Sequence, residues 1–176
     1  MKRFTEAGRK AIADKNLYAA LSLALMMPDI CGSLETPGVG NSQKRYKRWF
    51  AKWAEPKFTL NGKMFLSASD CFQLRCSLIH SGSSYLEPDK QDVIERIEFF
   101  DDSGPAHLGW LEGNTFNGVK QPNTLVLIAS KFSETMYQCA EEWDEAVAND
   151  ADIQREKRKL LVIRSSGYNI GGIQFG

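Results

Sequence analysis

An arginine and a histidine, Arg75 and His80, lie five residues apart in the segment RCSLIHSGSS. Histidine has an ordinary pKa of roughly 6.5, so its imidazole both accepts and donates a proton near neutral pH. Arginine stays charged, and its planar guanidinium matches two phosphate oxygens. Metal-independent RNA cleavage uses both groups: the imidazole moves a proton at the ribose 2′-hydroxyl or the leaving 5′-oxygen, while the guanidinium stabilises charge developing on the phosphate. The pair therefore suggests a nuclease site, and the alternative is a helix that simply ends on a histidine.

The spacing alone does not bring the two groups together. Side chains five residues apart on a helix point about 140° away from each other, at about 100° per residue. Ser81 and Gly82 predict that the helix ends at His80, which releases that residue from ideal helical geometry. A two-fold axis near this helix would bring two copies of Arg75 and His80 into one cleft. Two routes to a joint site follow: the long arginine side chain reaches around one turn of the helix, or a second copy in a homodimer completes the site.

The hydrophobic pattern predicts a single domain over residues 1–176, with a C-terminal tail at about residues 164–176. Turn residues and β-forming side chains predict a small β insert at about residues 93–119, including a hairpin at TFNGV. The expected fold class is mainly α. The expected helical segments, in chain order, are 17–27, a short second turn at 28–35, 42–53, a helix from Ser67 or Ser69 to His80, 124–147 and 152–163.

The segment at residues 42–53 is both aromatic and basic. Its aromatic residues recur at helical spacing, which favours core packing for Trp49 and Trp53. Lysines and arginines occupy the other faces, and Arg45, Arg48 and Lys52 are candidates for RNA contact because phosphates attract cationic side chains. Solvated helix faces are the plainer interpretation of the same residues.

Three acidic residues are candidate partners of the Arg75–His80 pair. Asp70 lies five residues before Arg75 and would orient it by a charge-assisted hydrogen bond. Alternatively, Asp70 favours the N-terminal end of its helix through the helix dipole. Glu35 and Asp29 are acidic residues in a mostly basic half of the chain, so either would suit Arg75 or His80 as a partner, or serve as an ordinary helix-end residue.

The charge of the chain is unevenly distributed. Lys and Arg balance Asp and Glu at 22 each, which excludes attraction to nucleic acid by net charge alone. Yet residues 1–80 hold 13 Lys and Arg against 6 Asp and Glu, whereas residues 81–154 hold 4 against 15. A basic first half is suited to phosphates, and the acidic stretch to water or a basic partner.

The cysteines and histidines give no metal-binding pattern. The four cysteines form no Cys-x-x-Cys, and their apolar neighbours are typical of reduced, buried thiols. We therefore expect no bound metal and no cofactor. The apolar run at 17–27 is too short to span a bilayer, and its flanks do not fit a secretory signal, so no membrane and a cytoplasmic location are expected.

The segment DCFQLRCSLIHSG resembles the Arg-x4-His signature of HEPN domains. The wider order is similar to a bacterial branch of that group: an apolar helix with PDICGSLE, a Tyr/Trp-rich basic helix, then the motif. Residues 19–35, 42–53 and 70–82 carry it, roughly the first half of the chain.

This resemblance implies a dimeric α-helical bundle, often a metal-independent endoribonuclease of toxin–antitoxin or anti-phage systems, with a cognate inhibitor protein as a possible partner. Arg75 would then stabilise the phosphate, and His80 would be the acid or base. The chain departs from many catalytic members in having Cys76 directly after the arginine, and Gly82 stands where one branch has tyrosine. The alternative is a catalytically inactive HEPN-like module that binds a protein or nucleic-acid partner.

Overall fold

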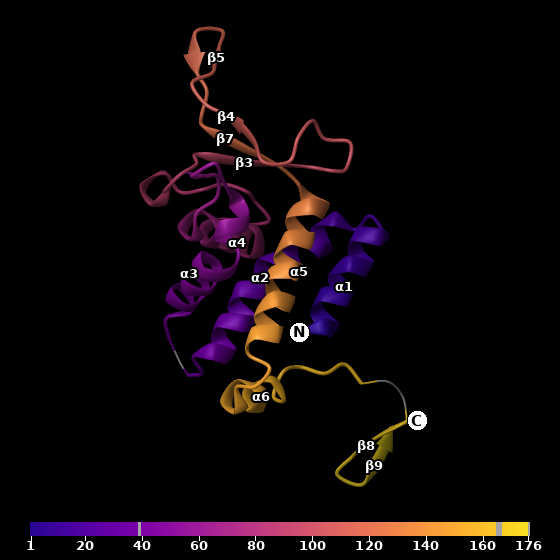
Figure 1. Ribbon diagram of the computed structural model, residues 1–176. Helices are drawn as coiled ribbons and strands as arrows, with labels where there is room; N and C mark the ends of the chain where they lie inside the picture. The colour runs from indigo at the N-terminus through magenta and orange to yellow at the C-terminus, as the bar shows by residue number, and fades with distance from the viewer. Residues whose placement is uncertain (39, 165–166, 176) are drawn as a thin grey trace.

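The structure is a computed structural model that describes residues 1–38, 40–164 and 167–175, and it is mainly α, about 53% helical (Figure 1). Its α-helices are α1 (Lys2–Ala13), α2 (Leu17–Glu35), α3 (Ser42–Trp53), α4 (Ala68–Ser81), α5 (Ala129–Ala146) and α6 (Ala151–Lys157). Short 3-10 turns are η1 (Glu55–Phe58) and η2 (Pro88–Lys90). The strands are β1 (Thr59–Leu60), β2 (Lys63–Met64), β3 (Arg96–Phe100), β4 (Gly109–Leu111), β5 (Thr115–Phe116), β6 (Val119–Lys120), β7 (Thr124–Ile128), β8 (Tyr168–Ile170) and β9 (Ile173–Phe175).

The central helix α2 runs straight through a proline. Asn16 caps it by accepting the Ala19 N–H, as expected, but the helix does not stop before Pro28. A proline inside a helix removes one backbone hydrogen bond, and here both Met27 and Pro28 are buried in the core, so tertiary packing outweighs that loss. The expected break at residue 28 is therefore wrong.

The continuous α2 also corrects the expectation about its length. With 19 residues, it is long and apolar enough to cross a membrane by length and composition. Half of its apolar stretch, however, is buried inside the fold. Helices α1, α3 and α5 all pack against it. Such burial is typical of the core helix of a globular domain as well.

Helix α3 confirms the expected aromatic stripe. Tyr46, Trp49 and Phe50 are buried, and the Tyr46 ring packs edge-on against Phe72 of α4. Trp53 is partly buried against the same core. The aromatic residues therefore fasten α3 to α4, and the cations of α3 remain on its outer faces.

The β insert is present, and it extends beyond residue 119. A three-stranded sheet has the order β3-β7-β4, with β7 parallel to β3 and antiparallel to β4. The expected hairpin at TFNGV is formed by β5 and β6 around Asn117 and Gly118, and it projects from one end of the molecule (Figure 1).

Residues 124–128 were expected to begin the long helix, and they form the central strand β7 instead. All five are buried, and a short run of apolar residues is equally compatible with a buried strand and a buried helix. Pairing with both β3 and β4 decides in favour of the strand, so α5 begins at Ala129.

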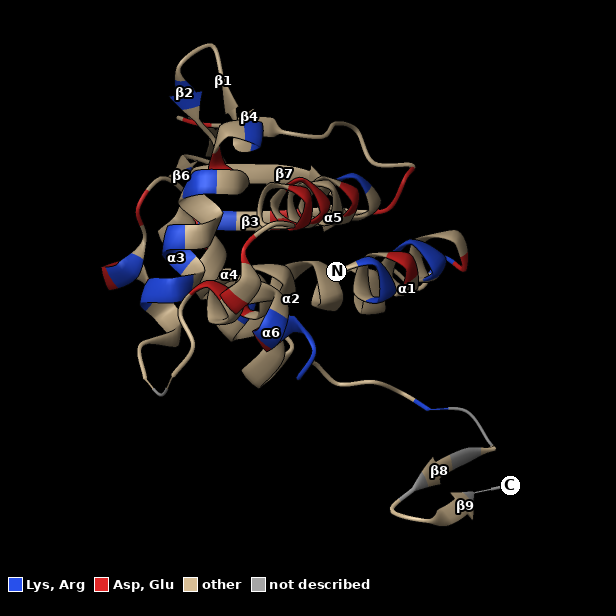
Figure 2. Ribbon diagram, turned by 60° about the horizontal axis from the view of Figure 1, so that its bottom comes forward, with Lys and Arg blue, Asp and Glu red and all other residues tan. Residues whose placement is uncertain are grey.

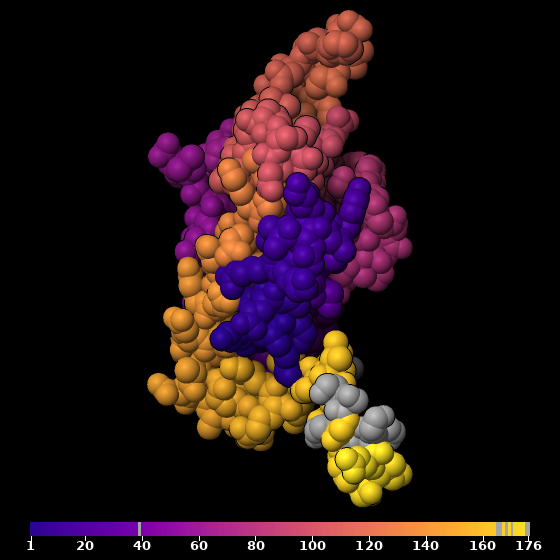
Figure 3. Space-filling view, turned by 90° about the vertical axis from the view of Figure 1, so that its right-hand side faces the viewer, coloured from indigo at the N-terminus to yellow at the C-terminus, as the bar shows by residue number. Residues whose placement is uncertain are grey.

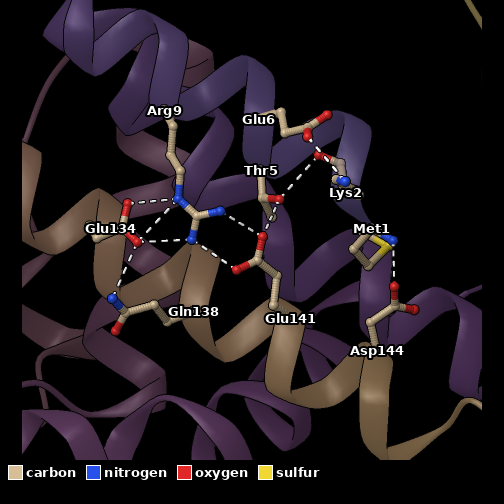
Figure 4. A network of polar contacts seen from close by, with 9 residues as sticks. All are labelled: Met1, Lys2, Thr5, Glu6, Arg9, Glu134, Gln138, Glu141 and Asp144. Atoms are coloured by element: carbon tan, nitrogen blue, oxygen red, sulfur yellow. Dashed lines mark hydrogen bonds and ion pairs between the residues drawn. The ribbon is translucent and has the colours of Figure 1, made fainter.

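Helix α1 lies along α5 and is fastened to it by a polar network (Figures 3 and 4). Arg9 contacts two carboxylates of α5, with Nη2 2.9 Å from Glu134 Oε1 and Nη1 2.6 Å from Glu141 Oε1. The backbone approaches closely here, because a Cβ at Gly8 would overlap the ring of Tyr137. The glycine therefore sets the distance between the two helices, and Arg9 joins them.

The C-terminal region is only partly helical. Helix α6 ends at Lys157, earlier than the expected residue 163. In the expected tail, β8 and β9 form an antiparallel hairpin, whereas residues 165, 166 and 176 lie outside the described residues.

Candidate functional site

The N-terminal end of α4 is organised by a buried aspartate. Ser67 caps the helix by accepting the Asp70 N–H at 3.1 Å, and its hydroxyl donates to Asp70 Oδ2 at 3.0 Å. The same carboxylate accepts the backbone N–H groups of Asp92 and Val93, each at 2.9 Å. Asp70 therefore attaches the segment before β3 to α4, and these hydrogen bonds agree with the helix-end interpretation. None of them goes to Arg75.

The other end of α4 presents His80 to solvent. Gly82 adopts a left-handed conformation, and its N–H binds Leu78 O at 2.9 Å while the Ser83 N–H binds Ser77 O at 3.2 Å. This pattern ends the helix one residue after the position expected from the sequence. His80 thus occupies the last turn, is exposed, and has no hydrogen bond or ion pair with any described residue.

Arg75 faces the opposite way, toward α2. Its Nε lies 2.7 Å from Asp29 Oδ2, and the two side chains are 22% and 20% exposed. Burial lowers the pKa of Arg75, but the hydrogen bond and charge of Asp29, together with the neighbouring Cys76 thiol, more than offset this effect, so the pKa lies above its usual value. Of the three acidic residues considered from the sequence, Asp29 is therefore the one that contacts the arginine.

The second acidic candidate, Glu35, serves another part of the fold. It accepts the indole N–H of Trp143 at 2.8 Å and lies 3.5 Å from Arg48 Nη2. Glu35 consequently ties the end of α2 to α5 and α3, and among the described residues it forms no hydrogen bond or ion pair with Arg75 or His80.

Within one chain, Arg75 and His80 do not converge. His80 is one turn beyond Cys76 and Ser77 on α4, at i+4 and i+3, so these three residues share a face. Arg75 is directed at Asp29, on a different face. A single copy of the chain therefore offers an oriented guanidinium near the middle of α4 and an accessible imidazole in its last turn, without a contact between them.

A pocket of about 330 Å³ lies beside the His80 face of α4, between α3, α4 and η2. Its outer wall is held by Gln73, which accepts the Glu87 N–H at 3.1 Å and donates to the Lys90 carbonyl. We refer to this cavity as the α3–α4 pocket; it is lined by Gln43, Lys47, Phe72, Gln73, Cys76, Ser77, Glu87 and Lys90.

The cationic residues predicted to contact RNA lie on α3 (Figure 2). Arg45 donates to the carbonyl of Gly38 at 2.8 Å, and Arg48 donates to the hydroxyl of Thr36. Lys52 is exposed, with its ammonium 4.9 Å from the centre of the Trp53 ring. Arg45 and Arg48 thus each donate one hydrogen bond to the loop between α2 and α3. Lys52 forms no ion pair with a described residue.

The cysteines are all free thiols, as expected. Cys31, Cys71 and Cys139 are buried, and burial raises the pKa of each. Cys76 differs from them because it is half-buried and lines the α3–α4 pocket. Among the described residues, no group of three or more His, Cys, Asp or Glu side chains is placed to hold a metal ion.

No protein-family model, curated protein or solved structure matches this chain.

Sequence reasoning missed the α3–α4 pocket. Gln43 and Lys47 are four residues apart on α3, and Lys90 lies more than 40 positions further along the chain, on η2. The i, i+4 spacing of Gln43 and Lys47 places them on one helix face, but nothing local predicts that the η2 segment closes over them. The hydrogen bonds of Gln73 to η2 and those of Asp70 to the residues just after it bring η2 into place.

Proposed function

We propose that this protein is a metal-independent endoribonuclease of the HEPN type, active as a homodimer in which the α4 helices of two copies form one cleft. The observation that carries the proposal is the C-terminal half of α4, where an exposed imidazole follows a guanidinium fixed by a carboxylate. These are the groups required for proton transfer and for phosphate stabilisation.

The roles follow from the contacts. Asp29 binds Arg75 through Nε, so Nη1 and Nη2 have no carboxylate partner among the described residues and remain suited to phosphate oxygens. His80 is free to accept the proton of a ribose 2′-hydroxyl or to donate one to the leaving 5′-oxygen. Asp29 acts as a positioning residue, because it orients the guanidinium without touching the substrate.

RNA attraction would come from the basic outer faces of α3. Phosphate contacts by Lys and Arg supply most of the sequence-independent affinity of nucleic-acid-binding proteins, and they make it sensitive to salt. Arg48 and Lys52 are exposed on this helix. In contrast, acidic residues line much of α5 (Figure 2), which disfavours an RNA path along that helix.

A second candidate function rests on the same ion pair. Arg75 is only 22% exposed and already has a carboxylate partner, so it would also suit a purely structural link between α4 and α2. In that case the chain is a catalytically inactive HEPN-like module that binds a protein or nucleic-acid partner.

Cleavage of single-stranded RNA in the presence of EDTA separates the two candidates. For the nuclease, Arg75→Ala and His80→Ala each lose cleavage, while His107→Gln and Arg96→Ala, which change the other histidine and an exposed arginine of β3, retain it. Wild-type protein that leaves RNA intact at every concentration refutes the nuclease. Cleavage that survives both substitutions refutes the assigned site.

Subunit mixing tests whether the site is shared. If Arg75 of one copy acts with His80 of the other, a mixture of the Arg75→Ala and His80→Ala proteins recovers about one quarter of the wild-type activity. Random exchange makes about half of the dimers mixed, and each mixed dimer holds one intact site of two. A mixture that stays inactive, or a gel-filtration mass equal to the monomer, contradicts the shared site.

A further inference from the structure

The α3–α4 pocket has the lining of a nucleotide site. It is about 330 Å³ in volume, within the range of small-ligand pockets. One wall is the ring of Phe72, which is half-buried and braced edge-on by Tyr46 at 5.3 Å between ring centres. A fixed aromatic face of this kind suits stacking of an unpaired base.

Polar groups surround that ring. Gln43 on α3 is exposed, and its carboxamide has no partner among the described residues, so it can both donate to and accept from the edge of a base. Gln73 is not available to a base, because the oxygen and the nitrogen of its carboxamide are both hydrogen-bonded to the η2 segment. Gln43 is therefore the residue suited to base discrimination.

The charge of the lining suits a single phosphate. Lys47 is held with its ammonium 3.0 Å from Ser69 Oγ and 5.9 Å from the centre of the Phe72 ring. On the opposite side, Lys90 forms an ion pair with Glu87. With two lysines and one glutamate, the pocket keeps an excess of one positive charge, which matches one phosphodiester group.

The pocket also lies next to the candidate nuclease residue. Cys76 and Ser77 line it, and His80 follows them on the same face of α4 one turn later. We propose that the α3–α4 pocket binds one nucleotide of single-stranded RNA, with the base against Phe72 and Gln43 and the phosphate near Lys47, and thereby presents the adjoining ribose to His80. This inference rests on the proposed nuclease function and gives it a base preference at one position.

Cys76 provides a direct test that does not need cleavage. It is the half-buried thiol of the four, and the other three are fully buried, so iodoacetamide should modify it first. We expect millimolar 5′-AMP, GMP, CMP or UMP to slow alkylation of Cys76, as located by peptide mass spectrometry, with one base protecting more than the others.

The substitution Gln43→Ala should weaken that protection about fivefold in apparent Kd, the effect of losing one hydrogen bond. Gln174→Ala changes an exposed glutamine of β9 and serves as the matched control, with protection as in wild type. Absence of protection by all four nucleotides overturns the inference. Equal protection in the Gln43→Ala protein overturns it as well, because the nucleotide then binds elsewhere.

Cleavage of RNAs that differ at one base separates this inference from the proposed function. We expect a preference for the base that protects Cys76 best, and we expect Gln43→Ala to flatten it while cleavage still depends on His80. If cleavage depends on His80 but no nucleotide protects Cys76 from alkylation, the nuclease proposal holds and nucleotide binding in the α3–α4 pocket is refuted. If nucleotides protect Cys76 but the protein never cleaves RNA, the nuclease proposal is refuted and the pocket is assigned to a free nucleotide.

Discussion

The ion pair between Arg75 and Asp29 gives the most decisive test of how α4 is held. Its Nε and Oδ2 atoms are 2.7 Å apart, and each side chain is about one-fifth exposed, at 22% and 20%. The Coulomb attraction at this separation is roughly 6 kcal/mol for an effective dielectric constant of about 20. Desolvation of the two charges removes most of that gain, and a charge-assisted hydrogen bond in such a position contributes about 2 kcal/mol net.

A double-mutant cycle isolates this contribution. We expect Asp29→Asn and Arg75→Met each to lower the free energy of unfolding by about 2 kcal/mol, because either change leaves a half-buried charge without its partner. The double variant should lose far less than the sum, giving a coupling energy of about 1–2 kcal/mol. For a chain of this size each single change corresponds to a fall in Tm of about 4–8 °C.

Urea unfolding followed by far-UV circular dichroism measures all four proteins, provided that the slopes stay equal. Additive single effects, with a coupling energy below about 0.3 kcal/mol, would mean that the ion pair does not form in solution. The same proteins then serve in the RNA assay. If Asp29→Asn is folded and dimeric but cleaves slowly at unchanged KM, Asp29 positions the guanidinium; full activity in that variant refutes the positioning role.

Three further predictions concern other parts of the fold. Asp70→Ala should cost about 2–4 kcal/mol in urea unfolding, because a buried carboxylate that accepts two backbone N–H groups is lost; an effect below 1 kcal/mol would contradict this network. Arg9→Gln should cost about 1–2 kcal/mol, discounted because Arg9, Glu134 and Glu141 are about one-third exposed, and raising the salt concentration should shrink the difference from wild type. Finally, His107 Nδ1 accepts the backbone N–H of Ile128, the last residue of β7. Burial, and after it the charge of Lys131, lowers the pKa of His107 below its usual value. As the pH falls, the unfolded chain therefore binds a proton at His107 before the folded chain does. The contribution of neutral His107 to stability is complete above about pH 6.5 and is lost as the pH falls below it. A His107→Gln protein whose Tm falls as steeply as that of wild type between about pH 7 and pH 5 would refute this linkage.

The sequence alone determined the elements whose causes are local. The aromatic spacing predicted α3 and its buried face, because the helical period is written into consecutive residues. Ser67, one of the two serines expected to begin α4, caps it, and Gly82 marked its other end. The Asn-Gly pair marked the β5–β6 hairpin, because caps and turns depend on a few neighbouring residues. Arg75 and His80 were recognisable by type and spacing as candidates for nuclease chemistry, and that role stays a prediction.

Only the tertiary structure decided the features that depend on distant partners. Residues 124–128 form a strand because β3 and β4 pair with them, and α2 continues through Pro28 because the surrounding core covers it. The partner of Arg75 is Asp29 and not Glu35. The packing of α4 on α2 decides this, because the spacing of charges along the chain fits either residue. The α3–α4 pocket likewise exists because Gln73 and Asp70 hold the η2 segment against α4. A cavity of this kind is made by surfaces that meet only after the chain has folded.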